Sequence, residues 1–190
     1  MQDYFRAFIA VEITDAIRAE LADVQSVVEE ANGHVSWVRP QNIHCTLVFL
    51  GDIFANMVNS ITTALKQATV GCKPFEIEIA GLGFFGSARS PRIIWAGMAG
   101  RTDALIELQG KITAAVLQVG LKPDEKPFKP HLTIGRVRSN RNAAALVKAI
   151  KANETKSFGK VSVERIVLMK SQLTANGPVY SLLLAKSLDG

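Results

Sequence analysis

The feature that most constrains this chain is a four-residue motif that occurs twice, as His44-Cys45-Thr46-Leu47 and as His131-Leu132-Thr133-Ile134. In each copy a proline stands four residues before the histidine, which favours an extended approach to the motif. Side chains at positions i and i+2 of a strand project from the same face. Each copy therefore predicts a strand that presents a histidine and a threonine hydroxyl side by side, with apolar residues anchoring the other face.

The two motifs belong to a longer repeat with an offset of 87 residues. The same offset relates Pro40 to Pro127, Gly33 to Gly120, and the apolar segment 9–11 to 96–98. We interpret this repeat as an internal duplication. It predicts a single catalytic domain over residues 1–190, made of two pseudo-symmetric lobes with one motif each, at 44–47 and 131–134.

Helical and extended patterns alternate along the chain. Apolar residues spaced three or four apart between Ile17 and Val28 predict a helix, with Thr14 as its N-cap. Further helices are expected from 51–52, from 100–102 and over 140–152, with strands over 5–11, 44–50, 73–79, 93–98, 158–168 and 179–184. This mixture predicts an α+β fold that is bilobal and duplicated, in which two antiparallel sheets face a central groove and the helices lie outside.

Composition favours a folded protein of the cell interior. The chain has 190 residues and 48% of them are hydrophobic, which is enough for a substantial core. The N-terminus does not resemble a signal peptide, and no apolar run approaches about 18 residues, so we expect a cytoplasmic protein without a membrane partner. Cys45 and Cys72 form neither a zinc-ligand pattern nor a disulfide framework, and both are expected to be buried thiols.

Positive charge gathers around the second motif. The formal net charge is +5 and the isoelectric point is near 9.4. Excess lysine and arginine raise the local concentration of phosphates, so this distribution predicts a polyanionic partner. Between residues 122 and 141 the basic residues are Lys122, Lys126, Lys129, Arg136, Arg138 and Arg141, against only Asp124 and Glu125.

Two histidines that face each other can act as an acid and a base, because imidazole titrates near neutral pH. Phosphoester cleavage needs both functions, and His44, Thr46, His131 and Thr133 are therefore the predicted catalytic residues. The threonine hydroxyls can donate hydrogen bonds to phosphoryl oxygens. Two histidines without neighbouring carboxylates or thiols leave a zinc site short of ligands, so we expect neither a metal nor another cofactor. His34 has no threonine at i+2 and is predicted to be a surface or capping residue.

At this level of detail the chain resembles a known family. The two motifs are similar to the signature tetrapeptides of the two-histidine phosphoesterase superfamily, and the RNA 2′,3′-cyclic phosphodiesterases, also called 2′–5′ RNA ligases, are the branch that it resembles. The resemblance extends over nearly the whole chain. It is carried by the segments 6–11, 47–51, 91–97 and 166–174 in addition to the motifs.

The resemblance implies a bilobal fold with a basic groove and a metal-independent hydrolysis of terminal 2′,3′-cyclic phosphate to a 2′-phosphate. It also implies the reverse 2′–5′ joining of RNA ends. His44 would donate a proton to the leaving 3′-oxygen and His131 would accept one from water, although the sequence alone does not fix which is which. The implied partner is RNA with 2′,3′-cyclic phosphate ends, tRNA-like fragments included, and the chain is expected to act as a monomer.

Other residues are candidates for substrate contact. Arg136 matches a family arginine near the phosphate, but strict alternation would place it opposite His131 unless a bend at Gly135 redirects it. Phe85, Arg89 and Arg92 are candidate RNA contacts, because aromatic and guanidinium planes stack on bases. A core position for Phe85 and a solvated surface position for Arg92 are the alternatives.

Two other functions fit the same residues. One is a cyclic phosphodiesterase for a small nucleotide such as an ADP-ribose cyclic phosphate, and the other is a non-catalytic RNA- or nucleotide-binding module.

Overall fold

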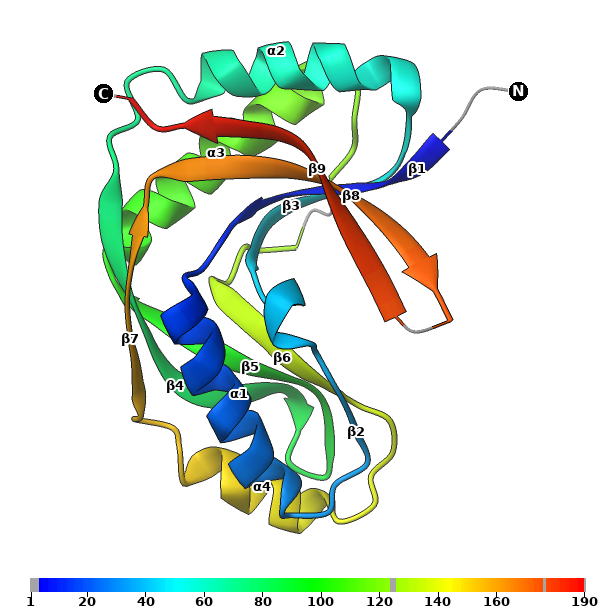
Figure 1. The fold of residues 1–190 in the computed structure, drawn as a ribbon, viewed down its shortest axis with the longest axis vertical. Coiled ribbons are helices and arrows are strands. Elements are labelled where there is room, and N and C mark those ends of the chain that lie inside the picture. The colour runs from blue at the N-terminus through cyan, green and yellow to red at the C-terminus, as the bar shows by residue number, and fades with distance from the viewer. Residues whose placement is uncertain (1–3, 124–125, 176, 190) are drawn as a thin grey trace.

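The computed structural model describes residues 4–123, 126–175 and 177–189, and its described part forms two antiparallel sheets and four α-helices (Figure 1). Asp124 and Glu125 lie outside the described residues. The predicted α+β fold with two antiparallel sheets is confirmed. Sheet A has the order β3 (Cys45–Phe54), β1 (Tyr4–Val11), β8 (Arg165–Thr174), β9 (Gly177–Ser187), and sheet B has the order β2 (Val35–Trp37), β6 (His131–Val137), β5 (Ser90–Gly100), β4 (Phe75–Ser87), β7 (Ser157–Val163).

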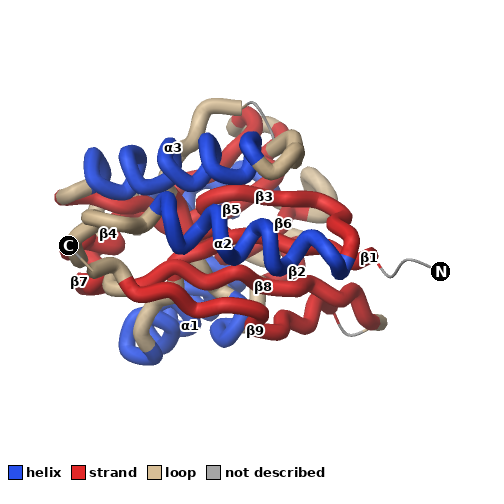
Figure 2. The backbone as a smooth tube through the Cα atoms, turned by 90° about the horizontal axis from the view of Figure 1, so that it is seen from above, coloured by secondary structure: helices blue, strands red, loops and turns tan. Residues whose placement is uncertain are grey.

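The helices lie on the outside of the sheets (Figures 1 and 2). α2 (Val58–Ala68) and α3 (Thr102–Gln118) pack side by side and contact sheet A through β9 and β3. α1 (Asp15–Glu29) and α4 (Ala143–Lys151) contact each other and sheet B. Each motif strand is therefore supported from behind by helices.

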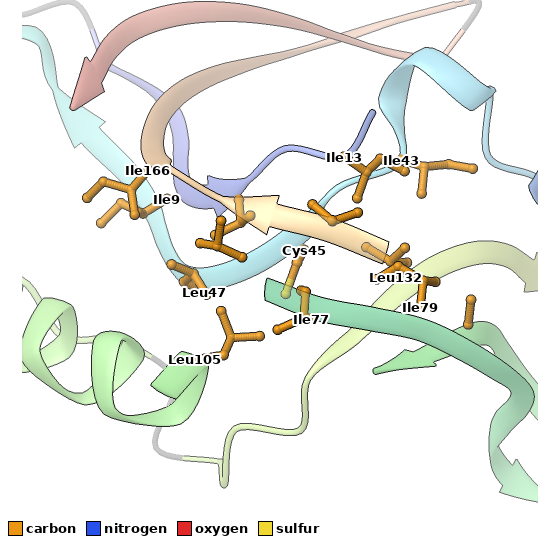
Figure 3. Packing of buried hydrophobic residues seen from close by; sticks show 14 of the residues in the cluster. Ile9, Ile13, Ile43, Cys45, Leu47, Ile77, Ile79, Leu105, Leu132 and Ile166 are labelled. Carbon is orange, nitrogen blue, oxygen red and sulfur yellow. The ribbon is translucent and has the colours of Figure 1, made fainter. Parts of the chain in front are cut away.

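One hydrophobic core joins the two sheets. Side chains from sheet A, including Ile9 and Leu47, meet Ile79 and Leu132 of sheet B and Leu105 of α3 in a single buried cluster (Figure 3). Full burial of each such aliphatic side chain stabilises the fold by about 1.5–3 kcal/mol. The two motif strands thus share one rigid support.

The predicted stripe of α1 is confirmed. Thr14 caps the helix by accepting a hydrogen bond from the backbone N–H of Ile17 at 3.4 Å. Ile17, Leu21, Val24 and Val28 are all buried. The same stripe also carries a buried polar residue, Gln25, which lies toward β6 and β2.

Three predictions about individual elements are wrong. No helix begins at 51–52, because β3 continues to Phe54 by pairing with the start of β1, and α2 begins only at Val58. The segment 158–168 is divided between β7 in sheet B and β8 in sheet A, because the chain crosses between sheets at Glu164. Cys45 is buried as expected, but Cys72 is partly exposed.

Candidate active site

His44 lies directly before β3, two residues after a 3-10 turn formed by Pro40–Asn42. Its ring stacks on Phe8 with centroids 4.6 Å apart and lies nearly perpendicular to the ring of Tyr180, with centroids 5.4 Å apart. Its Nδ1 is 2.8 Å from the carbonyl oxygen of Asn42. A carbonyl only accepts, so we assign the proton to Nδ1 and the lone pair of the neutral ring to Nε2.

His131 repeats this arrangement at the start of β6. Its Nδ1 is 2.6 Å from the carbonyl oxygen of Lys129, again two residues earlier in the chain. Phe85 meets the ring edge to face with centroids 5.0 Å apart. In both histidines the same backbone contact fixes the tautomer and leaves Nε2 available for proton transfer.

The surroundings of His44 disfavour its charged form. Burial lowers the pKa of His44, and the hydrogen bond to Asn42 opposes this effect. The positive charge of Arg18 lowers the pKa further, and Glu12 raises it. The residue is therefore held toward its neutral form in the free protein.

A β-bulge in β6 turns Arg136 toward the second motif. The register of β6 against β5 skips Ile134. As a result Thr133 and Arg136 pair with Trp95 and Ile93, which are two residues apart in β5 and so share one face. Strict alternation is therefore wrong for this strand, because the extra residue Ile134 places Arg136 on the face of Thr133.

β3 contains a bulge at the corresponding place. Its register against β1 skips Leu47, so Thr46 pairs with Ala10 and Phe49 pairs with Phe8. Phe49 is 60% exposed and its ring centroid lies 6.3 Å from that of Phe8. Phe49 and Arg136 each follow a motif threonine by three residues, and each presents a large exposed side chain on the motif face of its strand. Sequence reasoning missed Phe49; the shared spacing was the only signal for it.

The two motif strands lie against each other, because β3 and β6 are in contact. Burial raises the pKa of the Cys45 thiol to about 12, and a hydrogen bond from the backbone of His131 opposes this rise. The start of β6 therefore lies beside the residue that follows His44. Burial also raises the pKa of Tyr180, and the charge of Arg136 opposes it, so Arg136 of sheet B lies near the ring that contacts His44.

Of the three candidate RNA contacts, only Phe85 touches a motif histidine in the structure. Phe85 is half-buried and touches both His131 and Trp95, so it combines the core and site positions. Arg89 lies in the exposed turn between β4 and β5, and Arg92 is exposed near the start of β5.

His34 is exposed, and its Nδ1 lies 3.3 Å from the hydroxyl of Ser139. It stands beside β2 and Arg138, whose backbone N–H donates to the carbonyl of His34. This agrees with its predicted surface position.

Other types of site were sought over the described ranges 4–123, 126–175 and 177–189. No group of three His, Cys, Asp or Glu side chains there could hold a metal ion, and no helix there is long and apolar enough to cross a membrane. Two surface hollows, of about 430 Å³ between α2 and α3 and about 400 Å³ at the ends of β1, β3 and β8, are lined by neither motif. The lining of the first has no titratable side chain, and in the second Arg6 is paired with Asp52, so we place the chemistry at the histidines.

Comparison with known proteins agrees with this geometry. Residues 6–175 match the family model of the 2′-5′ RNA ligase superfamily. The chain belongs to this superfamily. A superfamily relative from Methanothermobacter thermautotrophicus, named RNA 2′,3′-cyclic phosphodiesterase, is 32% identical over 176 residues, covering 93% of this chain and 95% of the relative. A protein of the same name from Archaeoglobus fulgidus is 34% identical, with 92% and 96% coverage.

Two solved structures share the fold of this chain. TT0787 of Thermus thermophilus superposes with a TM-score of 0.78 at 28% identity, covering 96% of this chain and 97% of that protein. Escherichia coli LigT, crystallised with 3′-AMP, superposes with a TM-score of 0.80 at 21% identity, covering 99% of this chain and 100% of LigT. The fold of this chain is thus shared with TT0787 and LigT over nearly their whole lengths.

Proposed function

We propose that this protein is a metal-independent RNA 2′,3′-cyclic phosphodiesterase that hydrolyses a terminal 2′,3′-cyclic phosphate to a 2′-phosphate. The observation that carries the proposal is the matched pair His44 and His131, each with Nδ1 bonded to a backbone carbonyl, which leaves the lone pair of the neutral ring on Nε2. Relatives named RNA 2′,3′-cyclic phosphodiesterase support the same activity. A pure binding module would not need two histidines with fixed tautomers.

In the proposed reaction, Nε2 of neutral His131 takes a proton from water as the water oxygen attacks phosphorus. The bond between phosphorus and the 3′-oxygen breaks, and Nε2 of protonated His44 gives its proton to that oxygen. The products are a 2′-phosphate and a 3′-hydroxyl. Because burial lowers the pKa of His44 in the free protein, we propose that His44 takes up its proton together with the anionic substrate.

Thr46, Thr133 and Arg136 would stabilise the phosphoryl group. The threonines share the motif faces with the histidines, and their hydroxyls can donate to the non-bridging oxygens as charge shifts there. The bulge in β6 turns the Arg136 guanidinium to the same face, where it can pair with phosphate in a bidentate manner. If the 5′-hydroxyl of a second RNA end replaces water as the nucleophile, His131 takes its proton, the bond between phosphorus and the 3′-oxygen breaks as before, and a 2′–5′ phosphodiester forms, which is the 2′–5′ ligase activity.

RNA would be held by rings and by positive charge. Phe49 offers an exposed aromatic face beside Phe8, and Phe85 lies beside His131, so a base on either side of the phosphate can stack. Exposed Arg89 and Arg92 near the β4–β5 turn would contact the RNA backbone.

We also propose that residues 1–190 work as one catalytic domain of two pseudo-symmetric lobes, in a cytoplasmic monomer. The order β3-β1-β8-β9 in sheet A parallels β6-β5-β4-β7 in sheet B, with a motif strand at the head of each series. Both motif strands also bulge directly after the threonine. These parallels support a duplication.

The decisive experiment is product analysis on an oligoribonucleotide that ends in a 2′,3′-cyclic phosphate, with and without EDTA. We expect a 2′-phosphate product at the same rate in both samples, because side chains supply the acid and the base. Activity lost on chelation and restored by zinc or magnesium would contradict the mechanism. A series from mononucleotide to longer RNA, with an ADP-ribose cyclic phosphate alongside, separates an RNA enzyme from a small-nucleotide enzyme.

A further inference from the structure

A buried amide connects the two motif segments. Gln25 of α1 is only 7% exposed. Its Nε2 donates to the carbonyl of Val38 at 2.8 Å and to the carbonyl of Ile134 at 2.8 Å. A buried amide is costly unless its hydrogen bonds are made, and here both N–H groups of one side chain are used.

The positions of the two carbonyls give this contact its significance. Val38 lies where the chain leaves β2 of sheet B and begins to cross toward sheet A and His44. Ile134 is the bulged residue of β6 that stands between Thr133 and Arg136. The backbone N–H of Val38 also donates to the Ile134 carbonyl at 2.9 Å, so the three groups form one cluster.

The far end of the crossing segment is held as well. The side-chain amide of Asn42 donates to the carbonyl of Pro178 in β9 at 3.0 Å, and the Asn42 carbonyl accepts from His44. The segment is thus fixed to sheet A at Asn42 and to sheet B at Val38. Gln25 reinforces the backbone hydrogen bond that ties its sheet B end to the bulge of the second motif.

We propose that Gln25 is a positioning residue that sets the spacing between the two histidines and the direction of Arg136. The proposal rests on the proposed function for its effect on turnover, but its effect on the site geometry can be measured independently. A small displacement of catalytic groups is costly, since a misplacement of about 1 Å can lower a rate roughly 100-fold.

The test compares Gln25→Met with Val24→Ala. Methionine keeps the length and volume of glutamine but lacks the two donors. Val24 is a fully buried core residue at the adjacent position of α1, so its truncation lowers stability without removing a hydrogen bond to Val38 or Ile134. The readouts are the melting temperature, the ring Cε1–H NMR signals of His44 and His131, and kcat and KM on a cyclic-phosphate oligoribonucleotide.

We expect both variants to lower the melting temperature, but only Gln25→Met to move the two histidine signals and to lower kcat, by roughly 10- to 100-fold, with a smaller change in KM. If Gln25→Met leaves both signals and kcat at the values of Val24→Ala, Gln25 is only structural and the proposal is overturned.

Two further outcomes are also decisive. If the wild-type protein does not cleave cyclic phosphate, the proposed function fails while the NMR signals still decide the role of Gln25. If Gln25→Met does not fold, Gln25→Glu replaces it, because a carboxylate of equal size turns acceptors toward the two carbonyls. Histidine signals in Gln25→Glu that match Val24→Ala at the same pH would then overturn the proposal.

Discussion

Gly135 provides a quantitative test of how the second motif strand is built. It is buried in β6, directly before Arg136, and pairs with Trp37 of β2. A Cβ atom at this position would lie 2.9 Å from Cε3 of Trp37 and 2.9 Å from Cγ1 of Val35. Side chains of β2 thus occupy the place where a methyl group would go, so Gly135→Ala must push β2 and β6 apart.

The expected cost follows from this overlap. Inserting a methyl group into a filled core typically destabilises a protein by about 1–3 kcal/mol. For a chain of this size each kcal/mol shifts the melting temperature by about 2–4 °C, so Gly135→Ala should melt roughly 2–12 °C lower. The same displacement should move Arg136. The affinity for 2′-AMP, which carries the 2′-phosphate of the proposed product, should therefore fall as well.

Gly110→Ala is the matched control. Gly110 is exposed in the interior of α3, and a Cβ atom there would meet nothing within 4 Å. Alanine is favoured over glycine in a helix by about 0.5–1 kcal/mol, so this variant should melt higher and bind normally. Thermal unfolding and calorimetric titration of both variants provide the test. A Gly135→Ala protein as stable as wild type, with unchanged affinity, would refute the view that β2 fixes the geometry of β6.

Four other variants probe the site itself. His44→Ala and His131→Ala should each lower kcat by about 10²- to 10⁴-fold and leave the affinity for 2′-AMP within a few-fold, as steady-state kinetics and titration will measure; normal turnover in either would exclude the acid–base assignment. Arg136→Ala should reduce the salt dependence of RNA affinity by about one counterion. If the slope of log affinity against log salt concentration is unchanged, Arg136 does not bind phosphate. His44→Gln should flatten the pH dependence of stability. Burial lowers the pKa of His44 below its ordinary value of 6.5, so the unfolded chain takes up a proton at a higher pH than the folded protein does. The neutral ring therefore makes its full contribution to stability above pH 6.5. That contribution is lost as the pH falls through the folded-state pKa. Urea unfolding between about pH 4.5 and 7.5 measures the free energy of unfolding of both proteins. If this free energy changes equally with pH in His44→Gln and in the wild type, the effect of burial on His44 is contradicted.

The motif spacing predicted the parts of the site that depend on local periodicity. A histidine and a threonine two residues apart must share a face of any strand, and the register places Thr46 and Thr133 accordingly. The same reasoning predicted the buried stripe of α1, because apolar residues three and four apart meet on one side of a helix. Such patterns need no knowledge of the partner elements.

The parts that sequence reasoning missed depend on partners far away in the chain. A bulge exists only relative to the neighbouring strand, so the exposure of Phe49 and the turning of Arg136 could not be read from alternation alone. Gln25 lies 109 residues before Ile134, whose carbonyl is one of the two that accept from it. The division of 158–168 between sheets likewise follows from the pairing of β7 with β4 and of β8 with β1.

The two bulges explain how similar motif strands can build an unequal site. Each strand offers a histidine, a threonine and a third side chain at the same spacing, but the third is an aromatic ring at Phe49 and a cation at Arg136. The first histidine is stacked on Phe8 and desolvated, which disfavours its charged form, whereas an arginine stands on the face of the second. Phosphoester hydrolysis requires a proton donor and a proton acceptor at the same moment, so two identical surroundings would serve it poorly. The backbone geometry common to both strands brings the histidines together, and the residues at the bulges and behind the rings give them different tasks.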